Sequence, residues 1–374
     1  MKIAILTSAF PPEAEGAATH LPELAQALQE RGHRVQVVAV VNRQEIRDSY
    51  PFRVRRISRS QFPLVRDARI LMHLIRAARK SQVLYAYDLW WQASLAALLT
   101  GIPLVVKCTG DLVWERAMEA GDTKERLEEF LAAPKPLMLS LRHALQRFLA
   151  RSATRLTVSC DPICRLLMQW GVARERIEVI PNALPPNPRE KDEATYLAQW
   201  RGKPGLRLMT AGYVTRTKNL DLILGALENL PGARLAVVGD GPDLERIKAL
   251  TREKKLENRV LFTGKVPRHD VAGYVKECDV LILSSRIGKF NYVLMEAFHK
   301  GKPVVATREG FHPDFVEHGV TGWLLDNQDP MALQEVLEGI ASGRLTLPAN
   351  VSRPVAGWES MVAQTGELLE SLAS

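Results

Sequence analysis

The segment SSRIGKFNYVLMEAF, residues 284–298, contains residue types suited to a nucleotide site. Glu296 falls at or near the start of the helix predicted in VLMEAFHKG, where its carboxylate can accept hydrogen bonds from both hydroxyls of a ribose. A glutamate in this position also interacts favourably with the helix dipole, whether or not the helix binds a ligand. The residue alone therefore leaves both interpretations open.

Lys218 lies in GYVTRTKNLDLI, directly before an apolar-periodic helix. An ammonium group fixed there could neutralise the charge on a diphosphate leaving group. A solvated lysine at a helix start is the simpler alternative.

Two glycine-containing turns precede predicted helices. Gly16, in PPEAEGAATHLPEL, would let backbone amides approach a phosphate at a helix N-terminus, although a plain turn residue is the simpler interpretation. The second turn, AVVGDGPDLERI, has Leu244 where a dinucleotide fingerprint needs its third glycine, and it lacks the G-K-[ST] of a phosphate-binding loop. We therefore predict a structural role for this second turn.

Short apolar runs alternate with helical patterns along the whole chain. KIAILT, QVLYAYD and IPLVVKC belong to a first series, and LRLMTAG, ARLAVVG and DVLILSS to a second one that follows a Pro-rich, charged connector near residues 182–203. This alternation is typical of α/β domains with parallel sheets that are covered on both faces. Ligands bind such sheets outside the carboxyl ends of the strands, which predicts a site in a cleft between two domains.

Composition indicates an ordinary globular protein. The chain has 374 residues, of which 46% are hydrophobic and 25% charged, and no apolar run approaches the roughly 20 residues of a membrane span. Its N-terminal segment is a poor signal peptide, so we expect a cytoplasmic protein. The four cysteines lack the paired spacing of a zinc site, and we expect them to be reduced thiols.

The net charge of +8 comes entirely from the first half of the chain, where residues 1–190 carry 27 basic and 19 acidic residues. Arg142, His143, Arg147 and Arg151 recur there at helical spacing. They form either a solvated helix face or a surface for an anionic acceptor or an acidic membrane. Nucleic acid is disfavoured because no recognition motif accompanies the charge.

The order of these segments resembles the family 4 glycosyltransferases of the GT-B type. FPPEAEGAATHLPELAQALQERGHRVQVV, VIPNAL, VVGDGPDLERI, VLMEAFHKGKPVVAT, FVEHGVTGWLL and the terminal GWESM helix follow in that family's order. The resemblance implies two Rossmann-like, doubly wound parallel-sheet domains that face each other across a cleft. The implied domains are an acceptor domain at 1–187, a nucleotide-sugar domain at 188–353 and a helix at 354–374 that crosses back to the first domain.

The resemblance also implies an activity. Such enzymes transfer a sugar, here of the hexose type, from a nucleoside diphosphate donor such as a UDP- or GDP-sugar, with retention of configuration and without a metal or other cofactor. The acceptor would be a sugar, a lipid-linked glycan or a small molecule in glycan biosynthesis. Peripheral binding at the inner membrane face fits the basic first domain.

Site residues carry over position by position. Glu296 matches the ribose ligand, Lys218 the lysine on the diphosphate, which also has the catalytic role, and Gly16 the loop glycine near the phosphates. The remaining donor-side positions are Tyr213, Arg216, Val266, Gly288, Lys289, Phe290, and the backbone amides of Asn291, Tyr292 and Val293.

Two residues depart from the family pattern. Tyr213 replaces an arginine that joins the lysine on the diphosphate, and Gly288 replaces a glutamate that binds sugar hydroxyls. Each loss could cost on the order of 1–3 kcal/mol. Arg216 could supply the missing guanidinium, and Lys289, which replaces a glycine, could pair with a uronic acid donor.

On the acceptor side, VVKCTGDLVWERA resembles a subset of the family. Asp111 is the candidate contact with the acceptor hydroxyl or the transferred sugar, with Trp114 and Glu115 behind it. Alternatively, Asp111 is a helix N-cap and Trp114 packs in the core.

A second functional hypothesis follows from the two departures. The chain would then be a catalytically silent GT-B protein that binds a nucleotide sugar or supports a partner enzyme. A nucleotide-sugar epimerase is a third possibility, which the missing carboxylate at Gly288 disfavours.

Overall fold

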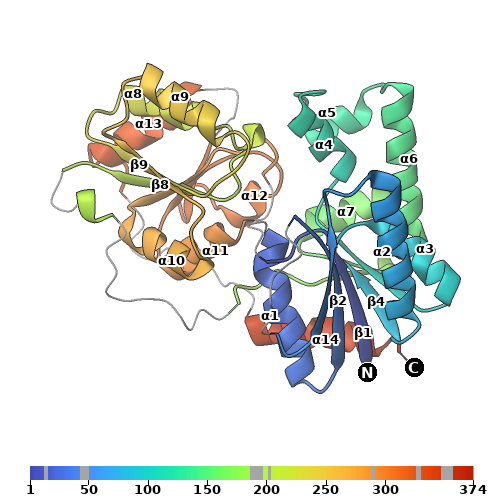
Figure 1. Ribbon diagram of the computed structural model, residues 1–374. Coiled ribbons are helices and arrows are strands. Elements are labelled where there is room, and N and C mark those ends of the chain that lie inside the picture. Colours follow the sequence, from blue (N-terminus) through green and yellow to red (C-terminus); the bar gives the residue numbers. More distant parts are fainter. Residues whose placement is uncertain are drawn as a thin grey trace. The chain divides into compact units, whose positions relative to one another are not determined.

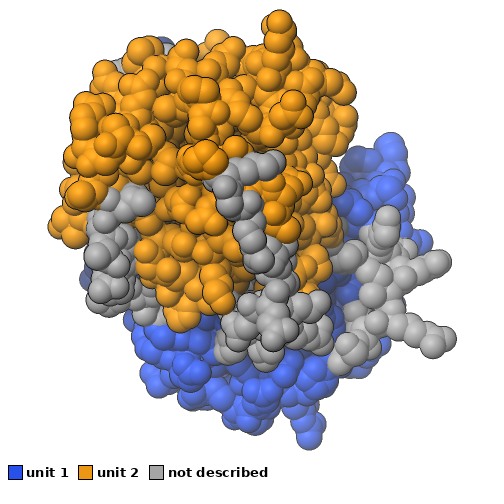
Figure 2. Space-filling model, turned by 90° about the vertical axis from the view of Figure 1, so that its left-hand side faces the viewer, with its two compact units in different colours: residues 1–113, 134–185, 356–374 blue, residues 114–133, 186–355 orange. Residues whose placement is uncertain are grey.

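The chain folds into two compact units. The computed structural model describes residues 1–11, 16–42, 50–185, 197–200, 204–288, 291–325, 330–346 and 357–373. Unit 1 comprises residues 1–113, 134–185 and 356–374, and unit 2 comprises residues 114–133 and 186–355 (Figure 2).

Unit 1 is built on a seven-stranded parallel sheet in the order β3-β2-β1-β4-β5-β6-β7 (Figure 1). Its strands are β1 (Lys2–Thr7), β2 (Arg34–Val41), β3 (Arg53–Ser58), β4 (Val83–Ala86), β5 (Leu104–Cys108), β6 (Arg155–Val158) and β7 (Ile177–Val179). Its helices are α1 (Gly16–Glu30), α2 (Pro63–Ala78), α3 (Trp90–Thr100), α6 (Leu137–Ser152), α7 (Asp161–Gln169), the short η1 (Arg174–Arg176) and α14 (Trp358–Glu370). Every residue of β4 and β5 is buried, as expected for strands covered on both faces.

The last helix, α14, belongs to unit 1. Its buried residues Met361, Val362 and Leu369 share one hydrophobic cluster with Leu24 and Leu28 of α1. Figure 1 shows the two helices side by side. The C-terminal segment therefore packs on the first sheet although it follows unit 2 in sequence.

Unit 2 is built on a six-stranded parallel sheet in the order β10-β9-β8-β11-β12-β13. Its strands are β8 (Arg207–Ala211), β9 (Arg234–Val238), β10 (Val260–Gly264), β11 (Val280–Leu283), β12 (Val304–Thr307) and β13 (Gly322–Leu325). Its helices are α5 (Leu127–Ala132), η2 (Ala198–Trp200), η3 (Arg216–Lys218), α8 (Leu220–Glu228), α9 (Leu244–Glu253), α10 (Arg268–Glu277), α11 (Tyr292–His299), α12 (His312–Phe315) and α13 (Pro330–Ala341), and α4 (Leu112–Ala120) begins in unit 1 and ends here. Two apolar clusters, one on each face, form its core.

Both sheets reverse their strand order at one point. The reversal lies between β1 and β4 in unit 1 and between β8 and β11 in unit 2. The predicted α/β class with two doubly wound parallel sheets is confirmed. Ligand sites in such sheets lie beside these reversals, at the carboxyl ends of the strands.

In the described part of the chain, every helix falls short of the length or the apolar character needed to cross a membrane.

Candidate active site

Lys218 lies at the strand reversal of unit 2. It ends the short helix η3, which follows β8, and hydrogen bonds join this segment to the loop that follows β11. Ser284 Oγ donates to Lys218 O at 2.6 Å, and the amide of Arg286 donates to Thr217 O at 2.8 Å. The backbone that carries Lys218 is therefore fixed at the carboxyl end of the sheet.

The Lys218 side chain is half-buried and reaches back along its own loop. A Cβ placed on Gly212 would lie 3.8 Å from Lys218 Nζ, so the ammonium passes close to the Gly212 backbone. Tyr213 is 45% exposed, and the Arg216 side chain is 78% exposed with Nε 3.9 Å from Asp243 Oδ1. Lys218 is thus the most enclosed cation of this loop.

Gly239 and Gly241 pack against the same loop through bare backbone. A Cβ on Gly239 would lie 2.0 Å from Gly212 O, and one on Gly241 would lie 2.2 Å from Val214 O. Side chains at these positions would push the β8 and β9 loops apart. The structural role predicted for this turn agrees with the geometry.

Gly288 occupies a position that only glycine fits. Its φ is +56°, and a Cβ there would lie 1.8 Å from Glu309 O. Gly310 faces it with φ +52°, and the amide of Phe311 donates to Gly288 O at 2.8 Å. Gly288 therefore does not merely lack a carboxylate. The loop closes over the space that any side chain at this position would need.

Glu296 is the fifth residue of α11, so the expected position at or near the start of the helix is wrong; its side chain is buried. Asn291 caps this helix by accepting a hydrogen bond from the amide of Val293 at 3.1 Å. The amide of Val293, expected to approach a phosphate, thus has a partner within the protein. Tyr292 is half-buried at the first position of the helix.

The positions of the other predicted donor-side residues say less about a donor site. Val266 is half-buried and packs against a core cluster of unit 2. Gly16 is the first residue of α1 in unit 1. Lys289 and Phe290 lie outside the described residues.

Two residues that follow β12 were not predicted from the sequence. Glu309 is buried, and its carboxylate pairs with Arg126 Nη2 at 3.0 Å. His312 is buried with Nδ1 3.0 Å from Thr307 O. The only sequence signal was their place directly after a buried apolar run.

Burial lowers the pKa of His312 to about 4; the bond to Thr307 O opposes this shift and the Lys218 charge adds to it. The unfolded chain binds this proton near pH 6.5 and the folded chain only near pH 4, so acidification favours unfolding in that window. We expect the free energy of unfolding to lose up to about 3 kcal/mol between pH 6.5 and 4 through this residue. Urea unfolding at pH 7 and 4.5 should show a smaller loss for His312→Gln than for wild type or for the exposed-site control His299→Gln. Equal losses in all three would contradict this assignment.

Asp111, the acceptor-side candidate, is buried in unit 1 and engaged by three groups. Its Oδ1 accepts from the amide of Val113 and from Gln146 Nε2, both at 3.0 Å, and its Oδ2 lies 2.8 Å from His143 Nε2. The N-cap alternative is therefore realised at the start of α4. Trp114, also buried, donates from Nε1 to Glu125 O at 3.0 Å, and Glu115 is buried as well.

His143 corrects one interpretation of the basic helix. The spacing of 142, 143, 147 and 151 suggested one solvated or anion-binding face. In the structure Arg142 and Arg151 are exposed, whereas His143 is buried against Asp111. His143 shares the inward face of α6 with Gln146 and Ala150, at i, i+3 and i+7.

The strand reversal of unit 1 holds polar groups that the sequence analysis did not single out. Asp88, after β4, accepts hydrogen bonds from the amide and hydroxyl of Ser8, after β1. Lys107, on β5, is buried, with Nζ donating to Asn182 Oδ1 at 2.7 Å and lying 5.7 Å from the Tyr87 ring centroid. Lysine at a central strand end is a weak signal in sequence, because burial is decided by the surrounding fold.

Burial lowers the pKa of Lys107 from 10.5 to about 8. Between these values the unfolded chain holds a proton that the folded chain has released, so the free energy of unfolding rises with pH. We expect a gain of up to about 3 kcal/mol between pH 8 and 10.5 from this residue. Unfolding curves at pH 8 and 10 should show the gain in wild type and in the exposed-site control Lys124→Met. A gain of the same size in Lys107→Met would contradict the assignment.

Two family models match successive parts of the chain. Residues 15–183 match the model described as glycosyl transferase 4-like domain, and residues 201–352 match glycosyl transferases group 1. The chain belongs to the group 1 glycosyltransferases. The family resemblance inferred from the order of the sequence segments is confirmed.

Curated relatives match this chain over limited stretches. The D-inositol 3-phosphate glycosyltransferase of Xylanimonas cellulosilytica is 30% identical over 216 residues, which cover 53% of this chain and 52% of that protein. The N-acetyl-alpha-D-glucosaminyl L-malate synthase of Bacillus anthracis is 39% identical over 97 residues, covering 26% and 25%. The matches thus span about half or less of these relatives.

Solved structures show the same fold over the full chain. HepE of Anabaena, crystallised with UDP and glucose, is 21% identical with a TM-score of 0.76, and covers 100% of both chains. Sucrose-phosphate synthase of Thermosynechococcus elongatus is 20% identical with a TM-score of 0.79, covering 100% and 99%. The fold of this chain is therefore GT-B.

Proposed function

We propose that this protein transfers a hexose-type sugar from a nucleoside diphosphate sugar to an acceptor, with retention of configuration and without a metal. The observation that carries the proposal is Lys218, held by hydrogen bonds to the β11 loop at the strand reversal of unit 2. Glu296, buried on the helix that follows this loop, would hold the donor ribose. HepE binds UDP-glucose in a crystal, which supports a nucleoside diphosphate sugar as the donor here.

The proposed reaction needs no protein nucleophile. The bond between the sugar C1 and the diphosphate oxygen breaks as the acceptor oxygen bonds to C1 from the same face. The departing diphosphate takes the acceptor proton, and Lys218 stabilises the charge that develops on it. The metal-independent course rests on the family resemblance.

Unit 1 would hold the acceptor, which we propose to be a sugar, a lipid-linked glycan or a small molecule. Asp111 is the proposed contact; its side chain is buried and also caps α4, and His143 and Gln146 position its carboxylate. Asp111→Asn keeps the shape of the side chain but weakens the bonds from these donors, so we expect roughly a tenfold or greater loss of kcat with donor affinity unchanged. Steady-state kinetics with varied acceptor test this, and full turnover in the variant would leave Asp111 as a helix cap only.

We further propose a cytoplasmic protein that associates peripherally with the inner membrane face. Helix α6 supports this, because it exposes a stripe of apolar side chains beside exposed Arg142 and Arg151. The stripe consists of Leu137, Met138, Leu141, Leu145 and Phe148. Apolar groups flanked by cations suit an anionic membrane surface.

A thermal-shift screen with UDP, GDP and their sugar conjugates tests the donor proposal, since a bound ligand raises the unfolding temperature according to its affinity. We expect at least one nucleotide to stabilise wild type and to stabilise Glu296→Ala much less. No shift with any of them would contradict the proposal.

The second candidate is a silent GT-B protein, favoured by Tyr213 and by the closed backbone at Gly288. Nucleotide-sugar binding without hydrolysis or transfer would support it. Consumption of donor by wild type would reject it.

A further inference from the structure

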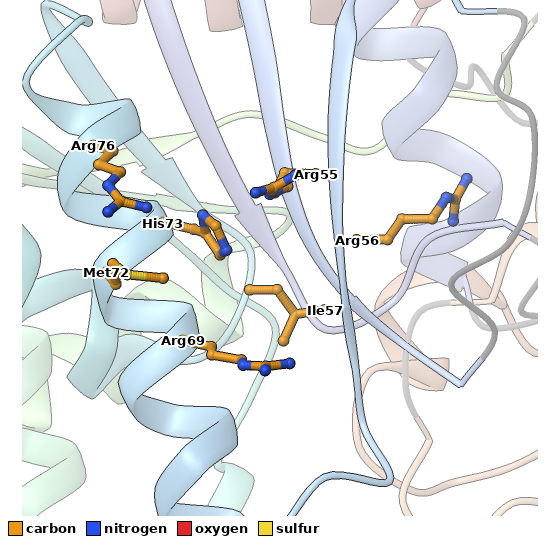
Figure 3. A pocket seen from close by; sticks show the side chains of 7 residues that line it. All are labelled: Arg55, Arg56, Ile57, Arg69, Met72, His73 and Arg76. Carbon is orange, nitrogen blue, oxygen red and sulfur yellow. The ribbon is translucent and has the colours of Figure 1, made fainter.

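A pocket of about 400 Å³ lies on unit 1, between α2 and the edge strand β3. Figure 3 shows the side chains of Arg55 and Ile57 from the strand facing Arg69, His73 and Arg76 from the helix. A smaller groove, about 180 Å³, shares Arg55, His73 and Arg76, and adds Arg53 and Lys80. The two hollows form one basic groove.

The spacing of these residues explains how they converge. Arg69, His73 and Arg76 follow the i, i+4, i+7 spacing of one helix face. Arg53, Arg55 and Ile57 alternate along the strand and share one face of the sheet. Arg56 points away in Figure 3, and its Nη1 donates to Pro11 O at 2.6 Å.

The charge of this region lacks a matching acid. Residues 53–80 contain nine cations and one carboxylate, Asp67. Asp67 is engaged elsewhere, by Arg66 and by Gln92 of α3. Within the described ranges, no carboxylate lines the groove.

The pKa of His73 reflects the same concentration of positive charge. Its imidazole is half-buried, and its pKa is lowered by burial and then by Arg55, Arg76, Arg69 and Arg53. Gln36 of β2 is the remaining polar group of the groove. Like charges gathered in one hollow repel one another, and this repulsion destabilises the fold unless an anion binds between them. Cations that only kept a surface solvated would have no reason to gather in one hollow.

We propose that this groove binds a phosphate monoester, through the guanidinium groups of Arg55, Arg69 and Arg76. Planar guanidinium groups form paired hydrogen bonds to phosphate oxygens, and a neutral imidazole adds a donor beside them. Arg55 on the strand and Arg69 and Arg76 on the helix are exposed and line the same pocket, so a dianion bound in it would meet cations from both elements. The inference does not depend on the transferase activity, because it concerns a separate surface of unit 1.

Titration with inorganic phosphate tests the site directly. Wild-type protein with labelled histidine should show a saturable shift of the His73 imidazole resonance, and its pKa should rise when the dianion is bound. This measurement needs no variant. A His73 resonance that does not move, or that moves without saturation, would overturn the proposal.

A matched pair of triple variants separates a built site from overall charge. Arg55→Gln, Arg69→Gln and Arg76→Gln together should weaken phosphate binding at least about tenfold. The control removes the same charge through Arg165→Gln, Arg252→Gln and Arg344→Gln, all at exposed positions, and should keep the wild-type affinity. Equal weakening in both triples would overturn the proposal, and circular dichroism checks that both fold.

Vesicle sedimentation identifies the source of the phosphate. Binding to phosphatidic acid vesicles, stronger than to phosphatidylserine vesicles of equal charge and displaced by inorganic phosphate, would assign the site to a lipid headgroup. Saturable binding of phosphate without such vesicle binding would assign it to a soluble ligand. Vesicle binding that ignores both the headgroup and the Arg55, Arg69 and Arg76 substitutions, together with no saturable phosphate binding, would overturn the proposal.

Discussion

Lys218→Met is expected to lower turnover by about 100-fold or more, because it removes the most enclosed cation beside the proposed leaving diphosphate. The substitution keeps an unbranched side chain of similar length. The hydrogen bond from Ser284 goes to the backbone of Lys218, so the loop itself should stay in place. Steady-state rates with a donor selected by the thermal-shift screen provide the measurement.

Lys248→Met is the control, since Lys248 lies on α9 and pairs with Glu245 on the surface of unit 2. It should change turnover less than about twofold. If Lys218→Met retained wild-type turnover, leaving-group stabilisation by this lysine would be excluded. The comparison requires that Lys218→Met unfolds at the same temperature as wild type, so that a loss of turnover does not reflect a loss of folding.

Gly288→Glu, which restores the carboxylate expected from the family pattern, is expected to destabilise the folded protein. The substitution would place a Cβ only 1.8 Å from Glu309 O. The backbone at this position also has φ +56°, which side chains rarely adopt. We expect a loss of roughly 3 kcal/mol or more in the free energy of unfolding, from strain and from forced separation of the two loops. Urea unfolding measures it.

Gly301 offers a matched control, because its φ is +64° and a Cβ there would meet nothing within 4 Å. Gly301→Ala should therefore cost only the left-handed strain, about 1 kcal/mol. Gly288→Ala should cost clearly more, by the energy of the contact with Glu309 O. If the two alanine variants were equally stable, the close packing of these loops would be wrong. A Gly288→Glu protein with native stability and higher turnover would restore the view that a carboxylate was simply lost.

The fold could be predicted because its signals are local and repeated. Runs such as LRLMTAG and ARLAVVG appear in the structure as β8 and β9, and their apolar character reflects burial on both faces of a parallel sheet. The turn at Gly239 and Gly241 was also predictable as structural, since neither nucleotide motif was complete. These features need only a few neighbouring residues to be recognised.

The site was harder to predict because its decisive contacts join distant segments. Gly288 was interpreted as a missing carboxylate, and only its contact with the Glu309 backbone shows that a side chain would not fit. His143 was grouped with exposed arginines by spacing, whereas its partner Asp111 lies on another element. Lys107 and His312 acquire their shifted pKa values from burial, which a sequence does not display.

The basic groove shows both situations at once. The arginine-rich segment 53–80 is obvious in sequence, but its charge alone is as typical of a solvated surface as of a site for an anionic partner. That Arg55, Arg69 and Arg76 surround one hollow follows only from the packing of α2 on β3. Charge is visible locally, and convergence is a tertiary property.

The central claim is that the protein consumes a nucleotide sugar at unit 2. Proton NMR of the donor anomeric signal, followed over time with a panel of UDP- and GDP-sugars, tests it most directly. We predict that wild type consumes at least one donor and that Lys218→Met slows this by about 100-fold. A panel in which no donor is consumed, or in which Lys218→Met consumes it as fast as wild type, would contradict the account.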